Sequence, residues 1–143
     1  MLTCTKRYDE IPIAHRQHRH DGHCALIHGH NWSFILTFAC EETDENGFVV
    51  DFGRLGYIRD WFNENLDHAC MIASDDPALS FLRERMPAGT IKIAEVPNPS
   101  CEGLAQYLFG VFDGMIRMRT KSRVWLHALA VEEDRRNYVQ YQP

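Results

Sequence analysis

The chain has 143 residues, of which 45% are hydrophobic and 24% are charged, and its formal net charge is −5. This length and composition are typical of a globular protein that buries a core, so we expect residues 1–143 to form a single domain. The acidic balance, without a dominant basic stretch, argues against nucleic-acid binding. No apolar run approaches the roughly 18 residues of a membrane span, so no membrane partner is expected.

The five cysteines do not form a disulfide pattern. Their number is odd, and no two of them stand in a C-x-x-C pair. The amino-terminal residues also lack the charged-then-apolar pattern of a secretory signal. We therefore expect reduced cysteines and a cytoplasmic protein.

Strand patterns dominate the first part of the chain. Residues 2–8 favour a strand that continues or restarts at residues 11–15, and the polar residues 16–23 favour a loop. A second strand is expected over residues 28–41. The Asn-Gly pair that follows predicts a hairpin turn with a returning strand at residues 48–52.

The second part of the chain mixes helices and strands. Apolar residues at spacings of three and four predict a helix over residues 53–65, and Ser74 could cap a shorter one. Later we expect a strand, a long helix capped by Ser100, a strand and a short terminal strand, at residues 90–96, 101–117, 124–131 and 138–141. Because strands and helices do not alternate singly, the order predicts an α+β fold with an antiparallel sheet.

Three histidines form a candidate metal site. His28 and His30 flank Gly29 in a strand pattern, so their side chains share one face of the strand. Two imidazoles are too few for zinc, and His15, at the end of a neighbouring apolar stretch, is the best third ligand. The histidines of the polar loop over residues 16–23 remain alternative ligands.

A series of short blocks, in family order from residue 4 to residue 141, resembles the 6-pyruvoyltetrahydropterin synthase superfamily. The blocks are Ala14-His15, Cys24-x-x-x-His28-Gly29-His30-Asn31, Asp51-Phe52, Leu66-Asp67-His68, Pro99-Ser100-Cys101-Glu102 and Glu133. The three residues between Cys24 and His28 are similar to the spacing of the bacterial 6-carboxytetrahydropterin synthases of queuosine biosynthesis. The pyruvoyl enzymes usually carry a longer gap there.

The resemblance implies the tunnelling fold, a four-stranded antiparallel sheet with two long helices packed on one face. In this family, sheets from several subunits join into a β-barrel, commonly in a hexamer built from two trimers. The active sites lie between the subunits. We therefore expect a homo-oligomer, which would also cover exposed strand edges.

The resemblance also implies a zinc-dependent lyase reaction. The substrate would be 7,8-dihydroneopterin triphosphate, and the products 6-carboxy-5,6,7,8-tetrahydropterin, acetaldehyde and triphosphate. The three histidines would bind Zn²⁺ as a Lewis acid. Cys24 would accept a proton as the thiolate, and Asp67 would orient His68 as a general acid or base.

A carboxylate is expected to bind the pterin, because the ring presents two adjacent N–H donors that a carboxylate accepts as a fork. Glu133 matches the family's carboxyl-terminal glutamate by its spacing to Tyr141. Glu132 is the adjacent alternative. Glu102 and Ser100 are further candidates for substrate contact, although both residue types are also ordinary at the start of a helix.

Two other functions remain open. One is a 6-pyruvoyltetrahydropterin synthase that eliminates triphosphate and keeps the side chain, and the other is a non-catalytic zinc-binding oligomer of the same fold. The sequence departs from the family at Gly103, where asparagine is frequent. Arg16, Arg19 and Lys121 are candidates for the triphosphate, but exposed basic residues are usually only solvated.

Overall fold

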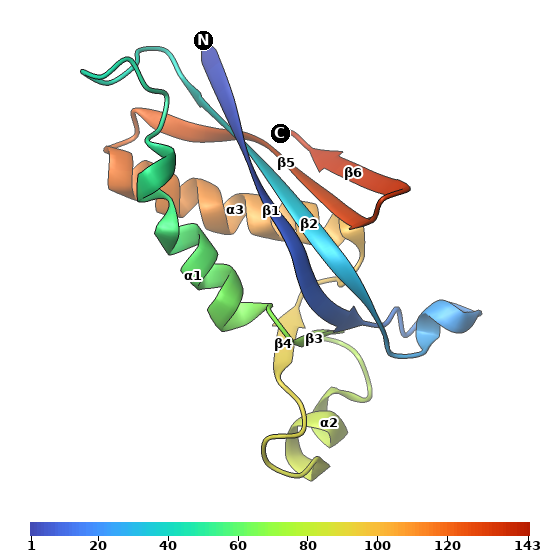
Figure 1. The fold of residues 1–143 in the computed structure, drawn as a ribbon. Helices are drawn as coiled ribbons and strands as arrows, with labels where there is room; N and C mark the ends of the chain where they lie inside the picture. The colour runs from blue at the N-terminus through green and yellow to red at the C-terminus, as the bar shows by residue number, and fades with distance from the viewer.

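The computed structural model describes residues 1–143 and has an α+β fold (Figure 1). Its strands and helices are, in chain order, β1 (Leu2–His15), β2 (His28–Cys40), α1 (Gly56–Asn65), β3 (Cys70–Ala73), α2 (Leu79–Arg85), β4 (Ile93–Val96), α3 (Cys101–Thr120), β5 (Val124–Asp134) and β6 (Asn137–Tyr141). Two 3₁₀ turns lie at His23–Ala25 and Phe52–Arg54. None of the helices combines the length and the apolar character that a membrane crossing needs.

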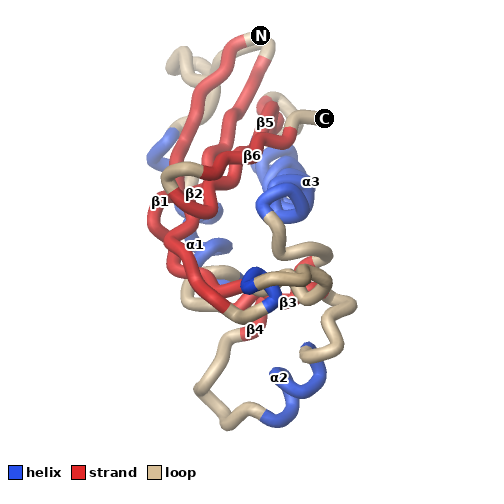
Figure 2. Tube along the Cα trace, turned by 90° about the vertical axis from the view of Figure 1, so that its right-hand side faces the viewer, coloured by secondary structure: helices blue, strands red, loops and turns tan.

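The six strands form one mixed sheet in the order β4-β3-β1-β2-β5-β6. β1, β2, β5 and β6 pair antiparallel, whereas β3 and β4 extend the sheet in parallel beyond β1. The prediction of a four-stranded antiparallel sheet is therefore wrong in the number of strands, because the sheet has six. The sequence analysis did not predict β3. All four of its residues are buried, so it shows no alternation of apolar and polar positions. Figures 1 and 2 both place β3, β4 and α2 at the end of the molecule away from the chain termini.

The long antiparallel pair of β1 and β2 forms the centre of the sheet. β1 is one strand with a bulge between Tyr8 and Ile11, where the pairing register shifts. Both of these side chains are buried in the core, and Ile13 and His15 follow on the same face. The bulge therefore carries the core-facing side of β1 through to His15 at its end.

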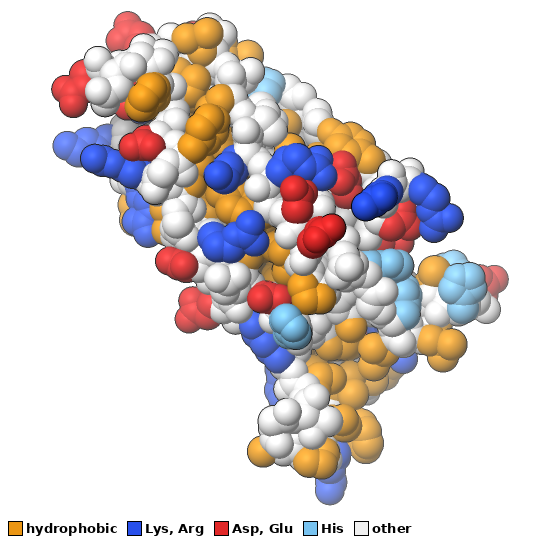
Figure 3. Space-filling view, in the orientation of Figure 1, with side chains coloured by type: hydrophobic (Ala, Val, Ile, Leu, Met, Phe, Trp, Pro, Cys, Tyr) orange, Lys and Arg blue, Asp and Glu red, His pale blue; other side chains and the backbone are white.

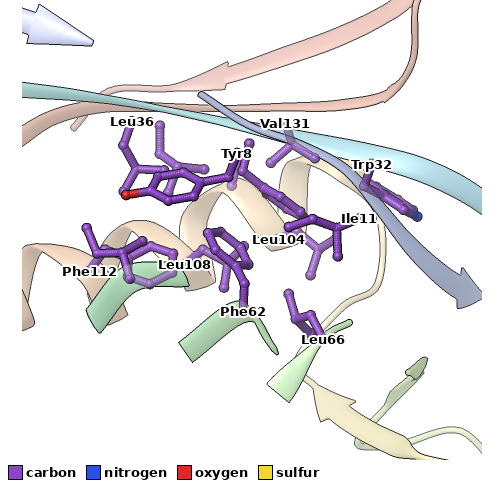
Figure 4. Packing of buried hydrophobic residues seen from close by; sticks show 14 of the residues in the cluster. Tyr8, Ile11, Trp32, Leu36, Phe62, Leu66, Leu104, Leu108, Phe112 and Val131 are labelled. Carbon is purple, nitrogen blue, oxygen red and sulfur yellow. The ribbon is translucent and has the colours of Figure 1, made fainter. Parts of the chain in front are cut away.

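α1 and α3 pack against one face of the sheet, as the resemblance implied (Figure 4). Phe62 of α1 lies at the centre of this contact. Its ring centroid is 5.3 Å from that of Tyr8, 4.8 Å from that of Phe34 and 5.1 Å from that of Phe112 on α3. The main core thus joins both helices to the inner strands, while α2 packs against a small separate cluster beside β3.

Residues 48–52 do not form the returning strand that the Asn-Gly turn predicted. The turn itself is present, with Gly47 at φ +79° and its N–H donating to the carbonyl of Asp44. β2, however, already pairs with β1 along one edge and with β5 along the other. No edge is left for a further strand, and Arg123 instead donates hydrogen bonds to carbonyl groups of this segment at 3.1 and 3.4 Å.

The short helix also begins later than Ser74 suggested. The Ser74 hydroxyl donates to the carbonyl of Val96 at 3.3 Å instead of capping a helix. Asp76 turns inward and accepts a hydrogen bond from the N–H of Ala78 at 2.8 Å, so α2 starts only at Leu79. The first predicted long helix is likewise shorter, because its first residues form a 3₁₀ turn.

Phe62→Ala should lower the free energy of unfolding by about 3–5 kcal/mol, because a wholly buried ring is removed from four aromatic neighbours. Urea unfolding would measure the change. The matched control is Phe81→Ala in α2, where the residue is 60% exposed and a change within about 0.5 kcal/mol is expected. Equal losses in the two variants would contradict the central place of Phe62.

Candidate metal centre and adjoining pocket

His15, His28 and His30 come together where β1 ends and β2 begins. His15 pairs directly with His28 in the antiparallel register, and His30 follows on the same face of β2. The ring centroids lie 4.6 to 5.3 Å apart, and one nitrogen from each ring lies within 4.8 Å of the others. In Figure 3 histidine side chains gather at this end of the sheet. The three predicted ligands thus form a cluster that could hold a metal ion, and no histidine of the polar loop joins it.

Hydrogen bonds orient two of these imidazoles. Nδ1 of His15 lies 2.8 Å from the carbonyl oxygen of Pro99, and Nδ1 of His28 lies 2.7 Å from that of Leu26. Because a carbonyl only accepts hydrogen bonds, each Nδ1 carries the proton, and a neutral ring then keeps its lone pair on Nε2. Burial lowers the pKa of His15 and so favours the neutral ring that a metal requires.

The Nε2 atoms of His15 and His30 are buried and have no hydrogen-bond partner. Buried polar atoms of this kind destabilise a protein unless something satisfies them. Oxygens of Glu133 lie 3.9 Å from Nε2 of His15 and 3.5 Å from Nε2 of His30. A divalent ion would satisfy both nitrogens, and three imidazoles leave it the open position typical of catalytic zinc. The residues present therefore fit a metal ion.

Trp32 supports the histidines from the core side. Its side chain is wholly buried, and its ring centroid lies 4.9 Å from that of His15 and 5.8 Å from that of His30. The indole N–H donates to the carbonyl of Ile13 at 3.0 Å. Sequence reasoning missed this residue, although strand alternation places it next after His30 on the same face.

A pocket of about 470 Å³ opens beside the histidines. The predicted site residues that line it are His15, Cys24, His28, Ser100, Glu102 and Glu133. Cys24 lies in the 3₁₀ turn His23–Ala25 and is partly buried. The Ser100 hydroxyl accepts the N–H of Gly103 at 3.0 Å, so it caps α3 while also facing the pocket.

Asp67 and His68 lie outside this pocket. Nδ1 of His68 is 2.7 Å from Oδ1 of Asp67, so the two side chains form a hydrogen-bonded pair. His68 has a left-handed backbone with φ +59°, and its side chain is 80% exposed. It lines a separate hollow of about 580 Å³ that also includes His30. A single chain therefore does not bring Asp67 and His68 into the pocket that holds Cys24.

The two neighbouring glutamates of β5 have different partners. The guanidinium of Arg7 donates to both carboxylate oxygens of Glu132, at 2.8 and 3.3 Å. Glu133 faces the histidines, and the Cys101 thiol donates to its Oε2 at 3.7 Å. Burial, reinforced by the Glu133 carboxylate, raises the pKa of Cys101 to about 12, so this thiol keeps its proton. Of these two glutamates, only Glu133 lines the pocket beside the histidines.

The basic residues considered for the triphosphate are placed elsewhere. Arg16 and Arg19 are each paired with an aspartate, and Lys121 caps the carboxyl end of α3, whose other end forms the pocket wall. Arg136, in the turn before β6, is the sole lysine or arginine in the pocket lining. Sequence reasoning assigned Arg136 no role.

The structure explains the departure from the family at Gly103. A Cβ atom at this position would lie 2.5 Å from the carbonyl oxygen of Asn98. The Asn98 side chain also accepts the N–H of Ser100 at 3.0 Å. The chain entering α3 therefore packs so closely on the first helical turn that only glycine fits.

The sheet, the helices on one face and the histidine cluster define an α+β protein with a candidate metal centre. The family model described as 6-pyruvoyl tetrahydropterin synthase matches residues 3–143. A 6-carboxy-5,6,7,8-tetrahydropterin synthase of Rickettsia conorii is 31% identical over 109 residues, which is 76% of this chain and 78% of that protein. The same-named protein of Rickettsia bellii is 32% identical over 109 residues, with the same shares of both chains. The chain belongs to the 6-pyruvoyl tetrahydropterin synthase family.

Solved structures share the fold. An uncharacterised protein of Wolinella succinogenes matches with a TM-score of 0.83 and 19% identity, over 99% of this chain and 97% of that one. The 6-pyruvoyl tetrahydropterin synthase of Caenorhabditis elegans matches with a TM-score of 0.68 and 18% identity, over 99% and 95% of the two chains. The architecture described above is therefore that of the family.

His30→Ala should abolish stoichiometric metal binding, because two imidazoles remain where three converge. Metal content after equilibration with Zn²⁺ and dialysis would be measured by elemental analysis. The control is His127→Ala, which removes an imidazole on β5 outside the cluster and should leave the metal content unchanged. Full occupancy in His30→Ala would refute the ligand set.

Proposed function

We propose that the protein is a zinc-dependent 6-carboxytetrahydropterin synthase, a carbon–carbon lyase of queuosine biosynthesis. It would convert 7,8-dihydroneopterin triphosphate and one water molecule to 6-carboxy-5,6,7,8-tetrahydropterin, acetaldehyde and triphosphate. The observation that carries the proposal is the convergence of three imidazoles beside a pocket that also holds Cys24 and Glu133. The names of the Rickettsia relatives and the short gap between Cys24 and His28 support it further.

His15, His28 and His30 would hold the zinc ion, which supplies Lewis-acid polarisation of the substrate's side-chain hydroxyls when bound. Cys24 would accept the proton that leaves the carbon beside these hydroxyls, acting as the thiolate. Its place in the same pocket as His15 and His28 supports this role. The five cysteines are all free, which suits a reducing, cytoplasmic location.

Asp67 and His68 would act as a proton relay from a second copy of the chain. Asp67 accepts the hydrogen bond from Nδ1 of His68, which leaves Nε2 to exchange a proton with the substrate. The exposure of His68 and the absence of both residues from the Cys24 pocket support a site completed between subunits. We therefore propose a homo-oligomer, a hexamer of two trimers in which the sheets join into a barrel, and the open edges of β4 and β6 suit such an assembly.

Glu133 would bind the pterin through the fork of two N–H donors on the ring. The alternative, Glu132, is disfavoured because Arg7 already occupies both of its oxygens. Glu102 and Ser100 line the pocket and would contact the substrate at its edge. Capping by Ser100 leaves a lone pair of its hydroxyl oxygen for this contact.

A second candidate is the 6-pyruvoyltetrahydropterin synthase reaction, which the description of the matching family model favours. The two reactions share the substrate and differ in whether the side chain leaves the ring. A non-catalytic zinc-binding oligomer is the third outcome that the test below distinguishes.

Incubation of the zinc-loaded protein with 7,8-dihydroneopterin triphosphate should release acetaldehyde and form 6-carboxytetrahydropterin. Mass analysis of the pterin and enzymatic detection of acetaldehyde would measure both products. A pyruvoyl product without acetaldehyde would select the second candidate. No turnover with full zinc occupancy would favour the non-catalytic oligomer.

Glu133→Gln should raise KM about 10- to 100-fold, because an amide replaces the charged acceptor of two hydrogen bonds. Steady-state kinetics would measure the change. Glu132→Gln is the matched control on the adjacent residue, and its KM should stay at the wild-type value. The reverse result would assign the pterin to Glu132.

A further inference from the structure

A buried carboxylate anchors the loop that carries Cys24. The side chain of Asp76 has no exposed surface, and it accepts hydrogen bonds from Nε and Nη2 of Arg16 at 2.7 and 3.2 Å. The N–H of Ala78 donates to the same carboxylate at 2.8 Å. A buried charge of this kind is stable only when it is paired and hydrogen-bonded, and the guanidinium fork provides both. Arg16 is therefore held firmly against the connection between β3 and α2.

Hydrogen bonds continue from the residue after Arg16 to Cys24. The N–H of Gln17 donates to the carbonyl of Cys24 at 2.8 Å. The Gln17 side chain donates to Oδ1 of Asn98 at 3.2 Å, and Asn98 packs on the first turn of α3 at Gly103. The turn that holds Cys24 is thus tied both to Arg16 and to the helix end that forms the pocket wall.

Arg19 and His18 add weaker contacts between the same loop and the connection between β3 and α2. Arg19 donates to Asp75 at 2.5 Å, and both side chains are exposed. His18 lies between the two aspartates, with ring nitrogens 3.7 and 3.9 Å from their carboxylates. Because the exposed pair is screened by solvent, the buried contact of Asp76 with Arg16 is the main attachment.

We propose that Asp76 is a positioning residue for Cys24, acting through Arg16 and Gln17. The inference rests on the proposed role of Cys24 as the proton acceptor. The segment between β3 and α2 then acts on the reaction without touching the substrate. A displacement of about 1 Å in a catalytic group can lower a rate about 100-fold, so the attachment matters for turnover.

The metal centre should not depend on this attachment. His15 precedes Arg16, but it is held by its pairing with His28 and by its own hydrogen bond to Pro99. Loss of the Asp76 contact therefore loosens the loop beyond His15, while the pairing of β1 with β2 keeps the three imidazoles together. This separates a positioning role from general damage to the site.

Asp76→Asn keeps an oxygen that can accept one hydrogen bond and removes the charge. We expect kcat to fall about 10- to 100-fold with KM and zinc content unchanged. Alkylation of Cys24 by iodoacetamide in the zinc-loaded protein, mapped by mass spectrometry, should become faster because the loop is looser. The alkylation rate needs no substrate, so it tests the attachment even if the proposed pterin reaction is wrong.

Glu95→Gln is the matched control, because it breaks an exposed pair between β4 and Arg83 of α2 without reaching the loop. All four measurements should stay at wild-type values. Arg16→Lys keeps the charge but not the guanidinium fork, so kcat should fall and the alkylation rate should rise by smaller factors than in Asp76→Asn. This variant tests the proposal if Asp76→Asn does not fold. Unchanged kcat and alkylation in a folded Asp76→Asn would overturn the proposal, and so would a loss of zinc that parallels the loss of kcat.

Discussion

The antiparallel register between β1 and β2 is the constraint on which the site depends. It sets His15 opposite His28 and leaves His30 on the same face. A slip of one residue would turn the β2 histidines to the opposite side of the sheet. The bulge between Tyr8 and Ile11 is equally necessary, because regular alternation would put Tyr8 and His15 on opposite faces. With the bulge, one face of β1 serves the core at its start and the metal centre at its end.

The start of α3 connects the other parts of the site. The carbonyl of Pro99 orients His15, the Ser100 hydroxyl caps the helix, and the Cys101 thiol donates to Glu133. Three consecutive residues thus contact a candidate metal ligand, cap the helix and contact the proposed pterin-binding glutamate. The tight approach of Asn98 to Gly103 fixes this segment against the helix. A small shift of the helix end would therefore disturb several features of the pocket together.

Local patterns were sufficient for the parts of the structure that depend on neighbouring residues. Strand alternation pointed to the shared face of His28 and His30, and the serine cap located the start of α3. The predictions failed where long-range pairing decides. Residues 48–52 have strand character, but both edges of the preceding strand β2 are already paired. β3 is a short buried segment that pairs with the other edge of β1. The Ser74 hydroxyl donates to Val96 of β4, a strand that comes about twenty residues later in the chain, so the residues around Ser74 do not reveal this contact.

The position of Trp32 has a thermodynamic consequence. The indole belongs to the buried core and also forms the wall beneath His15 and His30, so the metal centre cannot form without the folded core. An ion that binds only the folded chain stabilises it by linkage, by about 2.7 kcal/mol at a free concentration a hundredfold above its dissociation constant. Metal supply would then govern how much of the chain survives heating or proteolysis, and not only how much of it is active.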